Sequence, residues 1–136
     1  MTYTLTEQAN SDVITNLFAA ENRSDWDAVY RPFKPDCIGH AGATLQTSLA
    51  EMRESDPKIF ALFASHQRTL LAVVAQGDLI GARWRADVTT AGSGKPASWE
   101  GSSWWRFEGA VVAECWAYFD SADVQRQMRP PKEEAK

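Results

Sequence analysis

The sequence SWEGSSWWRFEGAVVAECWAYFD (residues 98–120) contains two apolar runs separated by Glu108-Gly109. Because glycine adopts positive φ without steric cost, this dipeptide predicts a two-residue hairpin turn. Gly77-Asp78 and the loop AGSGKP (91–96) divide the preceding apolar chain, which starts near Arg68, in the same way. The second half of the chain therefore predicts an antiparallel meander of four long strands.

Side chains of a strand alternate between the two faces of a sheet, so the turn predicts which residues lie together. With Phe107 opposite Ala110, one face carries Trp99, Ser103, Trp105, Glu114, Trp116, Tyr118 and Asp120. Pairing across the 91–96 loop adds Trp84, Ala86 and Val88 to that face. The other face carries Arg83, Arg85, Asp87, Glu100, Trp104 and Arg106. A β-bulge would invert part of this assignment.

Helical spacing of apolar residues marks the first half of the chain. The residues from Val13 to Phe18 predict a first helix that ends at Asn22. A second, short helix is expected between Ser24, as the capping residue, and Pro32. Cys37 to Ala41 predicts a short strand.

Two further helices are predicted before the strands begin. One starts near Thr44 or at Ser48, where Ser48 and Glu51 form a capping box. The other starts at Asp56-Pro57, which has the pattern of a cap followed by proline at the first helical position. This last helix is expected to bury Ile59, Phe60 and Phe63.

Length and charge narrow the class of protein. The chain has 136 residues, 14 Lys and Arg, 18 Asp and Glu, and a net charge of −4. The length fits one domain, placed over residues 1–128, with a charged and proline-rich tail (129–136) expected to be disordered. The acidic balance argues against a nucleic-acid partner, which needs a basic patch. No apolar run is long enough for a membrane span, and no signal peptide is evident, so we expect a cytoplasmic protein.

Metal and cofactor sites are not expected. Cys37 and His40 are three residues apart, so on a strand they point to opposite faces and do not share a metal. Cys37 and Cys115 are expected to be free thiols. Glycine-rich nucleotide motifs and the serine hydrolase motif are missing from the sequence, so a nucleotide cofactor and serine hydrolase chemistry lack support.

The order of elements and the local motifs resemble a known family. The motif residues are Gly77-Asp78, Arg83, the 91–96 loop, Trp99-Glu100-Gly101, Arg106-Phe107-Glu108-Gly109, Glu114, Trp116 and Asp120. Together they resemble the SnoaL-like polyketide cyclases of the nuclear-transport-factor-2-like (NTF2-like) superfamily, over about residues 7–128 and most strongly over 76–120. The resemblance implies an α+β cone, with N-terminal helices packed on a curved antiparallel β-sheet, and a homodimer. The family's cyclases carry a histidine where this chain has Arg106, so the resemblance supports the fold and pocket more than the cyclisation.

Asp120 is the first candidate for catalysis, because the resemblance implies that it is a general acid/base. An apolar surrounding raises a carboxyl pKa towards the working pH, and Trp105, Trp116 and Tyr118 are expected to provide it. The alternative is that Asp120 caps the turn before Ser121.

His40 is the second candidate, either as a group that orients a substrate oxygen or pairs with Asp120, or as a satisfied core or rim histidine. The expected ligand-binding residues also include Trp84, Trp99, Tyr30 and Glu114, although Glu114 fits a structural ion pair better. His66 is expected to be exposed, and the role of Arg106 is open.

Two functions fit these residues. The first is a cofactor-free cyclase, isomerase or lyase acting on a small apolar, carbonyl-bearing ligand that stacks on tryptophan. The second is a non-catalytic module that binds a ligand or dimerises through the outer sheet face, with Trp104 at the interface. An open pocket ending at Asp120 would favour the enzyme.

Overall fold

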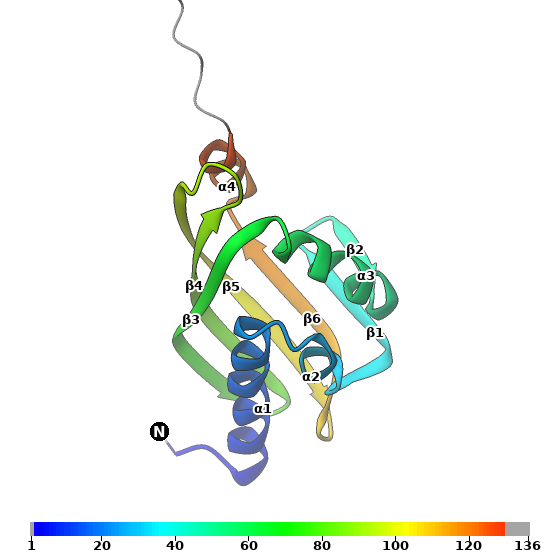
Figure 1. Cartoon of the computed structure of the whole chain (residues 1–136). Helices are drawn as coiled ribbons and strands as arrows, with labels where there is room; N and C mark the ends of the chain where they lie inside the picture. Colours follow the sequence, from blue (N-terminus) through cyan, green and yellow to red (C-terminus); the bar gives the residue numbers. More distant parts are fainter. Residues whose placement is uncertain (1, 130–136) are drawn as a thin grey trace, which may run out of the picture.

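The computed structural model describes residues 2–129 (Figure 1). Helices α1 (Leu5–Asn22) and α2 (Trp26–Tyr30) come first, followed by strands β1 (Phe33–Ala41) and β2 (Leu45–Ser48) and helix α3 (Leu49–Phe60). Strands β3 (Phe63–Gln76), β4 (Leu79–Thr90), β5 (Pro96–Glu108) and β6 (Val111–Phe119) follow, and α4 (Ser121–Met128) is last. The predicted tail lies outside the described residues apart from Arg129.

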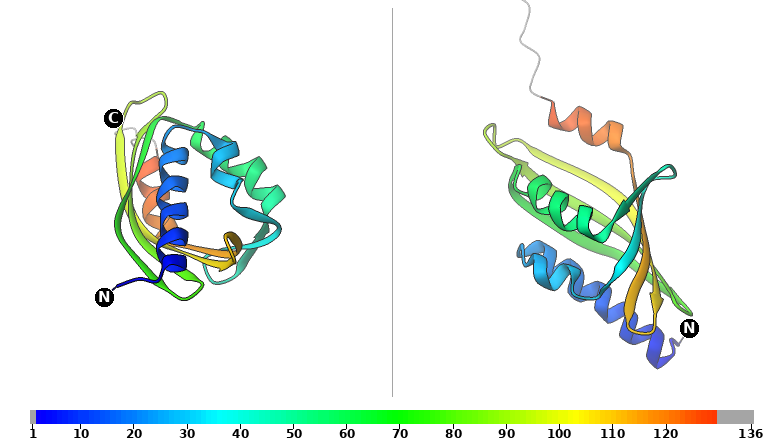
Figure 2. Two further views of the ribbon diagram at one scale, coloured as in Figure 1. Left: turned by 90° about the horizontal axis from the view of Figure 1, so that it is seen from below. Right: turned by 90° about the vertical axis from the view of Figure 1, so that its right-hand side faces the viewer.

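The six strands form one sheet in the order β2-β1-β6-β5-β4-β3. The predicted meander is confirmed, because β3 to β6 pair antiparallel in sequence order. The sheet as a whole is mixed, since β1 pairs in parallel with β6. Helices α1 to α3 cover its concave face (Figures 1 and 2), so the α+β prediction with N-terminal helices on a curved sheet is confirmed.

Side-chain caps explain where two helices begin. Thr4 and Glu7 form a capping box at α1 that was not predicted from the sequence. At α3, Ser48 accepts a hydrogen bond from the Glu51 N–H, as predicted. The prediction of Ser24 as the cap of α2 is wrong, because the cap is Asp25 and Ser24 has a φ of 56°.

The prediction of a separate helix that starts at Asp56-Pro57 is also wrong. Helix α3 continues through Pro57, whose carbonyl accepts a hydrogen bond from the Ala61 N–H at 3.0 Å. The missing backbone N–H of Pro57 therefore does not end the helix. Ile59 is 49% exposed rather than buried, and Phe63 begins β3.

The core lies between α1 and the concave, inner face of the sheet. Strand β4 buries the alternate residues Trp84, Ala86 and Val88, which confirms their predicted common face. Trp105 on β5 is buried beside them and meets the ring of Phe18 on α1 edge-on, with the ring centroids 5.9 Å apart. Burial of such large apolar side chains is the main stabilising contribution to the fold.

The register between β5 and β6 differs from the prediction. The turn is centred one residue later, so Glu108 pairs with Val111, and a register shift then follows between Arg106 and Phe107. Val112 and Ala113 are both buried, as expected where a bulge adds one residue to a strand. That extra residue inverts the faces of β6, so Trp105 lies opposite Cys115 rather than Val112.

Side chains protect the sheet edges. Asn22 of α1 exchanges two hydrogen bonds with the backbone of Arg68 on the edge strand β3, at 2.9 and 2.7 Å. Glu7 accepts a hydrogen bond from the N–H of Gly77 just beyond that strand. Gln127 of α4 pairs with both backbone groups of Ser98, beyond the end of β6. These contacts satisfy backbone groups that would otherwise be free to bind another strand.

Candidate functional site

Asp120 lies at the exposed start of α4, not on the inner face. Its carboxylate accepts a hydrogen bond from the Asp123 N–H at 3.0 Å, which is the contact of a helix cap. This matches the turn-capping alternative. The inverted register also means that Trp116 and Tyr118 do not share a face with Trp105.

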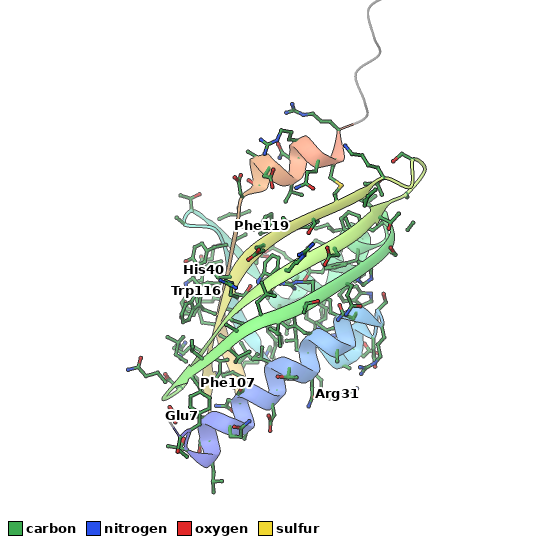
Figure 3. All side chains as sticks on the ribbon, turned by 90° about the vertical axis from the view of Figure 1, so that its left-hand side faces the viewer. Glu7, Arg31, His40, Phe107, Trp116 and Phe119 are labelled. Atoms are coloured by element: carbon green, nitrogen blue, oxygen red, sulfur yellow. The ribbon has the colours of Figure 1, made fainter. Side chains whose placement is uncertain are left out.

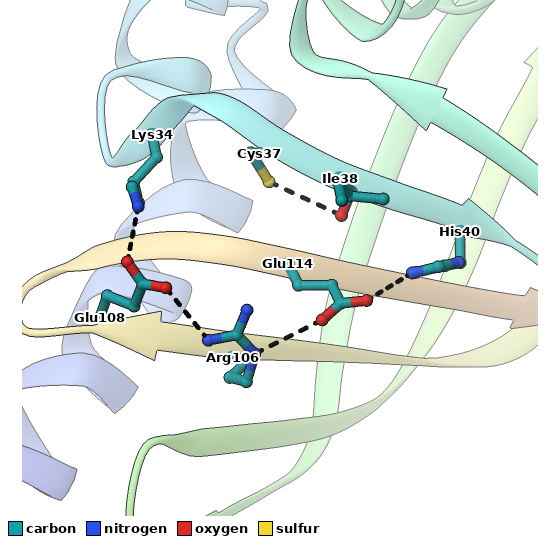
Figure 4. Close-up of polar contacts among 7 residues, drawn as sticks. All are labelled: Lys34, Cys37, Ile38, His40, Arg106, Glu108 and Glu114. Carbon is teal, nitrogen blue, oxygen red and sulfur yellow. Dashed lines mark hydrogen bonds and ion pairs between the residues drawn. The ribbon is translucent and has the colours of Figure 1, made fainter.

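His40 and Trp116 lie together on the convex, outer face of the sheet (Figure 3), and Glu114 lies beside them on the same face. The His40 Nε2 lies 2.7 Å from a Glu114 carboxylate oxygen, and the Trp116 ring stacks on the imidazole at 5.3 Å. Arg106 donates a hydrogen bond to the other Glu114 oxygen, and Glu108 continues the network (Figure 4). His40 therefore pairs with Glu114 rather than Asp120.

A second set of polar groups lies between the helices and the inner face of the sheet. We call Glu21, Tyr30, Asp56, His66 and Arg68 the interior polar cluster. They come from α1, α2, α3 and β3. Of these five residues, only Tyr30 was expected to contact a ligand.

Tyr30 and Asp56 form a close pair within this cluster. The Tyr30 hydroxyl lies 2.5 Å from an Asp56 carboxylate oxygen and 3.1 Å from the Met52 carbonyl oxygen. Burial raises the pKa of Asp56 above its ordinary value, although the Tyr30 hydrogen bond and the Arg68 charge oppose this shift. Tyr30 can donate to Asp56 when that carboxyl is ionised. When Asp56 is protonated, its carboxyl group can donate a hydrogen bond to the Tyr30 oxygen. The Tyr30 hydroxyl can then donate its own hydrogen bond to the Met52 carbonyl oxygen.

Glu21 and Arg68 form a buried ion pair. Arg68 Nη1 donates to both Glu21 oxygens, at 3.0 and 2.9 Å, and Glu21 is 6% exposed. The guanidinium group lies between the rings of Phe18 and Trp84, at 4.5 and 4.1 Å from their centroids. Burial raises the pKa of Glu21 and the charge of Arg68 opposes the shift.

His66 is half-buried, so its predicted exposure is wrong. Its Nε2 lies 3.2 Å from the Ser24 hydroxyl, and its ring packs on Phe60. The His66 Nδ1 and the Arg68 Nε are buried and have no hydrogen-bond partner among the described residues. A ligand that supplies a hydrogen-bond partner to such atoms removes the free-energy cost of burying them unpaired.

Aromatic side chains surround the cluster. Trp26 contacts Phe60 with ring centroids 5.2 Å apart, and Phe63 contacts Trp99 at 6.3 Å. Four of the predicted ligand-binding residues therefore lie on the interior side of the protein. They are Tyr30, Trp84, Trp99 and Trp105. Tyr118, Trp116 and Glu114 lie on the outer face instead.

Two grooves lie on the surface of the protein. One, of about 700 Å³, follows the ends of β3, β4 and β5 beside Gln127 and includes His66 in its lining. The other, of about 460 Å³, lies along Ser102 and Tyr118. Neither groove is lined by Asp56 or Asp120. Of the Tyr30–Asp56 pair, Tyr30 is buried and Asp56 is half-buried.

Sequence signals existed for part of the cluster. Glu21 follows Leu17 by four residues and so shares its helical face. Arg68 lies two residues before Leu70 and so shares its strand face. Asp56 has no such signal, because Asp followed by Pro is typical of a helix start.

Neither a membrane-spanning helix nor a metal cluster is found in the part of the chain that the structure describes. Within residues 2–129, no helix combines the length and apolar character that a bilayer span requires. Across the same residues, no three His, Cys, Asp or Glu side chains are grouped so as to hold a metal ion.

Comparison with known proteins identifies relatives of the whole fold. A family model described as SnoaL-like polyketide cyclase matches residues 11–128. No curated protein sequence matches the chain. A SnoaL-like protein from Jannaschia sp. CCS1 has a similar structure, with a TM-score of 0.87 and 15% identity over 97% of this chain and 99% of its own.

Two further structures share the fold. IdmH from Streptomyces antibioticus, named as a candidate polyketide cyclase, has a TM-score of 0.76 and 22% identity, over 87% of this chain and 96% of its own. TerC, co-crystallised with polyporic acid, has a TM-score of 0.76 and 15% identity, over 88% of this chain and 98% of its own.

Proposed function

The chain belongs to the SnoaL-like polyketide cyclase family, and from this we propose that its interior binds a small apolar ligand with a carbonyl group beside Tyr30 and Asp56. The observation that carries the proposal is the 2.5 Å contact between these two side chains within aromatic surroundings. The co-crystallisation of TerC with polyporic acid supports the proposal that this fold binds a small organic ligand.

The chemistry follows from the two protonation states of the pair. Ionised Asp56 is a base that can take a proton from carbon next to the carbonyl, and burial makes it a stronger base than an exposed carboxylate. Once Asp56 is protonated, its neutral carboxyl group can donate a hydrogen bond to the carbonyl oxygen of the ligand, on which negative charge develops. This assigns to Asp56 the acid/base role that the resemblance implied for Asp120, and it suits a cofactor-free isomerase, lyase or cyclase.

Asp56→Asn is expected to bind polyporic acid about tenfold more tightly than the unmodified protein at a pH at which Asp56 is ionised, because the asparagine amide donates a hydrogen bond to a carbonyl oxygen at every pH. Quenching of tryptophan fluorescence measures the affinity. In the unmodified protein, binding should tighten as the pH falls through the raised pKa of Asp56, above its ordinary 3.8, because the protonated carboxyl can donate to a carbonyl oxygen. Asp56→Asn should lose this pH dependence.

Asp120→Asn is the matched control, since the same change is made at an exposed helix cap. It should leave both the affinity and its pH dependence unchanged. Equal affinity in Asp56→Asn and the unmodified protein would contradict the proposal. Loss of binding in Asp120→Asn alone would move the site to the start of α4.

A second candidate function is supported by the outer face of the sheet. One row of residues crosses five neighbouring strands in register. From β3 to β1 it consists of Val74, Gly81, Trp104, Trp116 and His40. Val74 is 52% exposed, and the nearby apolar side chains Ile38 and Tyr118 are 43% and 40% exposed. An apolar row of this kind suits a homodimer interface, which needs neither catalysis nor a ligand.

Val74→Lys is expected to convert a dimer into a monomer, because it places an unpaired charge at the β3 end of this row, where the apolar side chain is most exposed. Sedimentation equilibrium measures the mass. Leu62→Lys is the matched control, since Leu62 is 67% exposed and precedes β3, away from the row. A monomeric unmodified protein, or a dimer that survives Val74→Lys, would exclude this interface.

A further inference from the structure

Two buried polar atoms on the inner face of β3 have no partner within the described part of the chain. They are Nδ1 of His66 and Nε of Arg68. These two residues lie opposite Val88 and Ala86, which are buried on the inner face of β4, so both side chains point into the interior. The carbonyl site proposed above uses neither atom.

Arg68 can only donate a hydrogen bond through this atom, because a guanidinium group stays protonated and has no acceptor. Its Nη1 already donates to both oxygens of Glu21, at 3.0 and 2.9 Å. The rings of Phe18 and Trp84 hold the group from two sides, at 4.5 and 4.1 Å. The guanidinium group cannot turn toward another side chain without breaking these contacts, so the Nε–H needs an acceptor that a ligand brings.

Ser24 decides which ring nitrogen of His66 carries the hydrogen. The Ser24 Oγ lies 3.2 Å from His66 Nε2, and the imidazole packs on the ring of Phe60 at 4.8 Å. When the hydroxyl donates to Nε2, the neutral imidazole carries its hydrogen on Nδ1. The buried Nδ1 is then a donor like the Nε of Arg68, and both require the same kind of partner, an oxygen acceptor.

The backbone at Ser24 supports this role for its hydroxyl. Ser24 follows α1 with a φ of 56°, in the left-handed region that favours glycine. The N–H groups of Ser24 and Asp25 donate to the carbonyl oxygens of Glu21 and Ala20, at 3.0 and 2.9 Å, in the pattern that usually has glycine at this position. Serine therefore adds backbone strain that glycine would avoid, and its hydroxyl gains the contact with His66.

We propose that His66 Nδ1–H and Arg68 Nε–H form a second subsite of the interior, which binds an acceptor oxygen of the ligand. Ser24 is the positioning residue that keeps the His66 donor directed into this subsite. The inference rests on the proposed function for the ligand and narrows its class. Besides the carbonyl group beside Asp56, the ligand carries a second carbonyl or carboxylate oxygen.

Sodium formate is the probe for the subsite, because it presents a carboxylate oxygen and does not require the carbonyl site. Nitrogen-15 NMR at about pH 8, where an ordinary imidazole is neutral, reports which ring nitrogen of His66 carries the hydrogen. We expect the hydrogen on Nδ1, and a saturable shift of the Nδ1–H signal as formate is added to the unmodified protein. Hydrogen on Nε2, or an Nδ1–H signal that formate leaves unchanged, would overturn the proposal.

Ser24→Gly is the test of the positioning role, since glycine suits the positive φ and only the hydroxyl is lost. It should fold normally, lose the preference for hydrogen on His66 Nδ1, and bind polyporic acid about threefold to tenfold more weakly, as expected when one hydrogen bond is lost. Ser24→Asn is the matched control. Asparagine also tolerates positive φ and its amide can donate to Nε2, so hydrogen should remain on Nδ1.

The two proposals fail in different ways. If Asp56→Asn changes the binding of polyporic acid and Ser24→Gly does not, the subsite is wrong and the carbonyl site stands. If formate shifts the Nδ1–H signal and polyporic acid does not bind, the subsite stands and the carbonyl site is wrong.

Discussion

Arg68→Met is expected to lower the free energy of unfolding by about 3–5 kcal/mol, because it leaves the carboxylate of Glu21 buried without its partner. Arg68 supplies both hydrogen bonds to this carboxylate, and Glu21 is 6% exposed. Methionine preserves much of the contact with the rings of Phe18 and Trp84, so the loss reports mainly on the charge. Urea unfolding followed by circular dichroism measures it.

The double variant Glu21→Leu, Arg68→Met is the control. It removes both charges together, so it should recover most of the stability that the single change loses. A double variant less stable than Arg68→Met would contradict this account.

The stability loss of Arg68→Met should depend on pH. Burial raises the pKa of Glu21, so the folded protein binds a proton more tightly than the unfolded chain does. The contribution of Glu21 to stability is therefore greatest below its ordinary pKa of 4.5 and declines as the pH rises through the raised pKa. The stability loss relative to the unmodified protein should accordingly shrink on acidification.

Gly101→Ala is expected to lower the free energy of unfolding by about 2–3 kcal/mol, the upper part of the range for overpacking a core. A β-carbon at this position would lie 2.6 Å from the Tyr118 carbonyl oxygen and 2.7 Å from Cη2 of Trp84. Tyr118 cannot retreat without breaking the β5–β6 pairing, and Trp84 is fixed by its hydrogen bond to Ser103. The reduced entropy of the unfolded chain offsets only about 0.4–1 kcal/mol of this loss.

Ser102→Ala is the matched control for Gly101→Ala. It changes the next residue of β5, whose side chain points to the opposite face. Thermal unfolding should distinguish the two variants clearly. An equal, small effect at both positions would show that the inner face around Trp84 repacks more freely than its contacts indicate.

The fold was largely predictable because its signals are local. Glycine at the Gly77 turn, the cap at Ser48 and the alternation along β4 each act over a few residues, and all three predictions are confirmed. The parallel pairing of β1 with β6 was not predicted, because it joins segments far apart in the sequence. Helix α4 was not predicted either, since it buries no residue completely and has only a short apolar pattern.

The site was less predictable than the fold, because one extra residue in β6 decides on which face of the sheet the candidate side chains lie. The buried neighbours Val112 and Ala113 mark the bulge that moves Glu114 and Trp116 to the outer face, and no residue there carries a recognisable bulge signal. The interior polar cluster depends on how α1, α2, α3 and β3 converge, which spacing within one segment does not reveal. At 15–22% identity, residue roles carried from a relative therefore need a structural alignment of this hairpin.

Helix α1 also guards against aggregation. Strand β3 is 14 residues long and lies at the margin of the sheet, where an unprotected strand can recruit other chains. Asn22 occupies the backbone groups of Arg68 at its middle, and Glu7 occupies the N–H of Gly77 just past its end. Loss of the N-terminal helix would thus expose a long, apolar template for intermolecular strand growth, so the helix protects colloidal stability as well as the core.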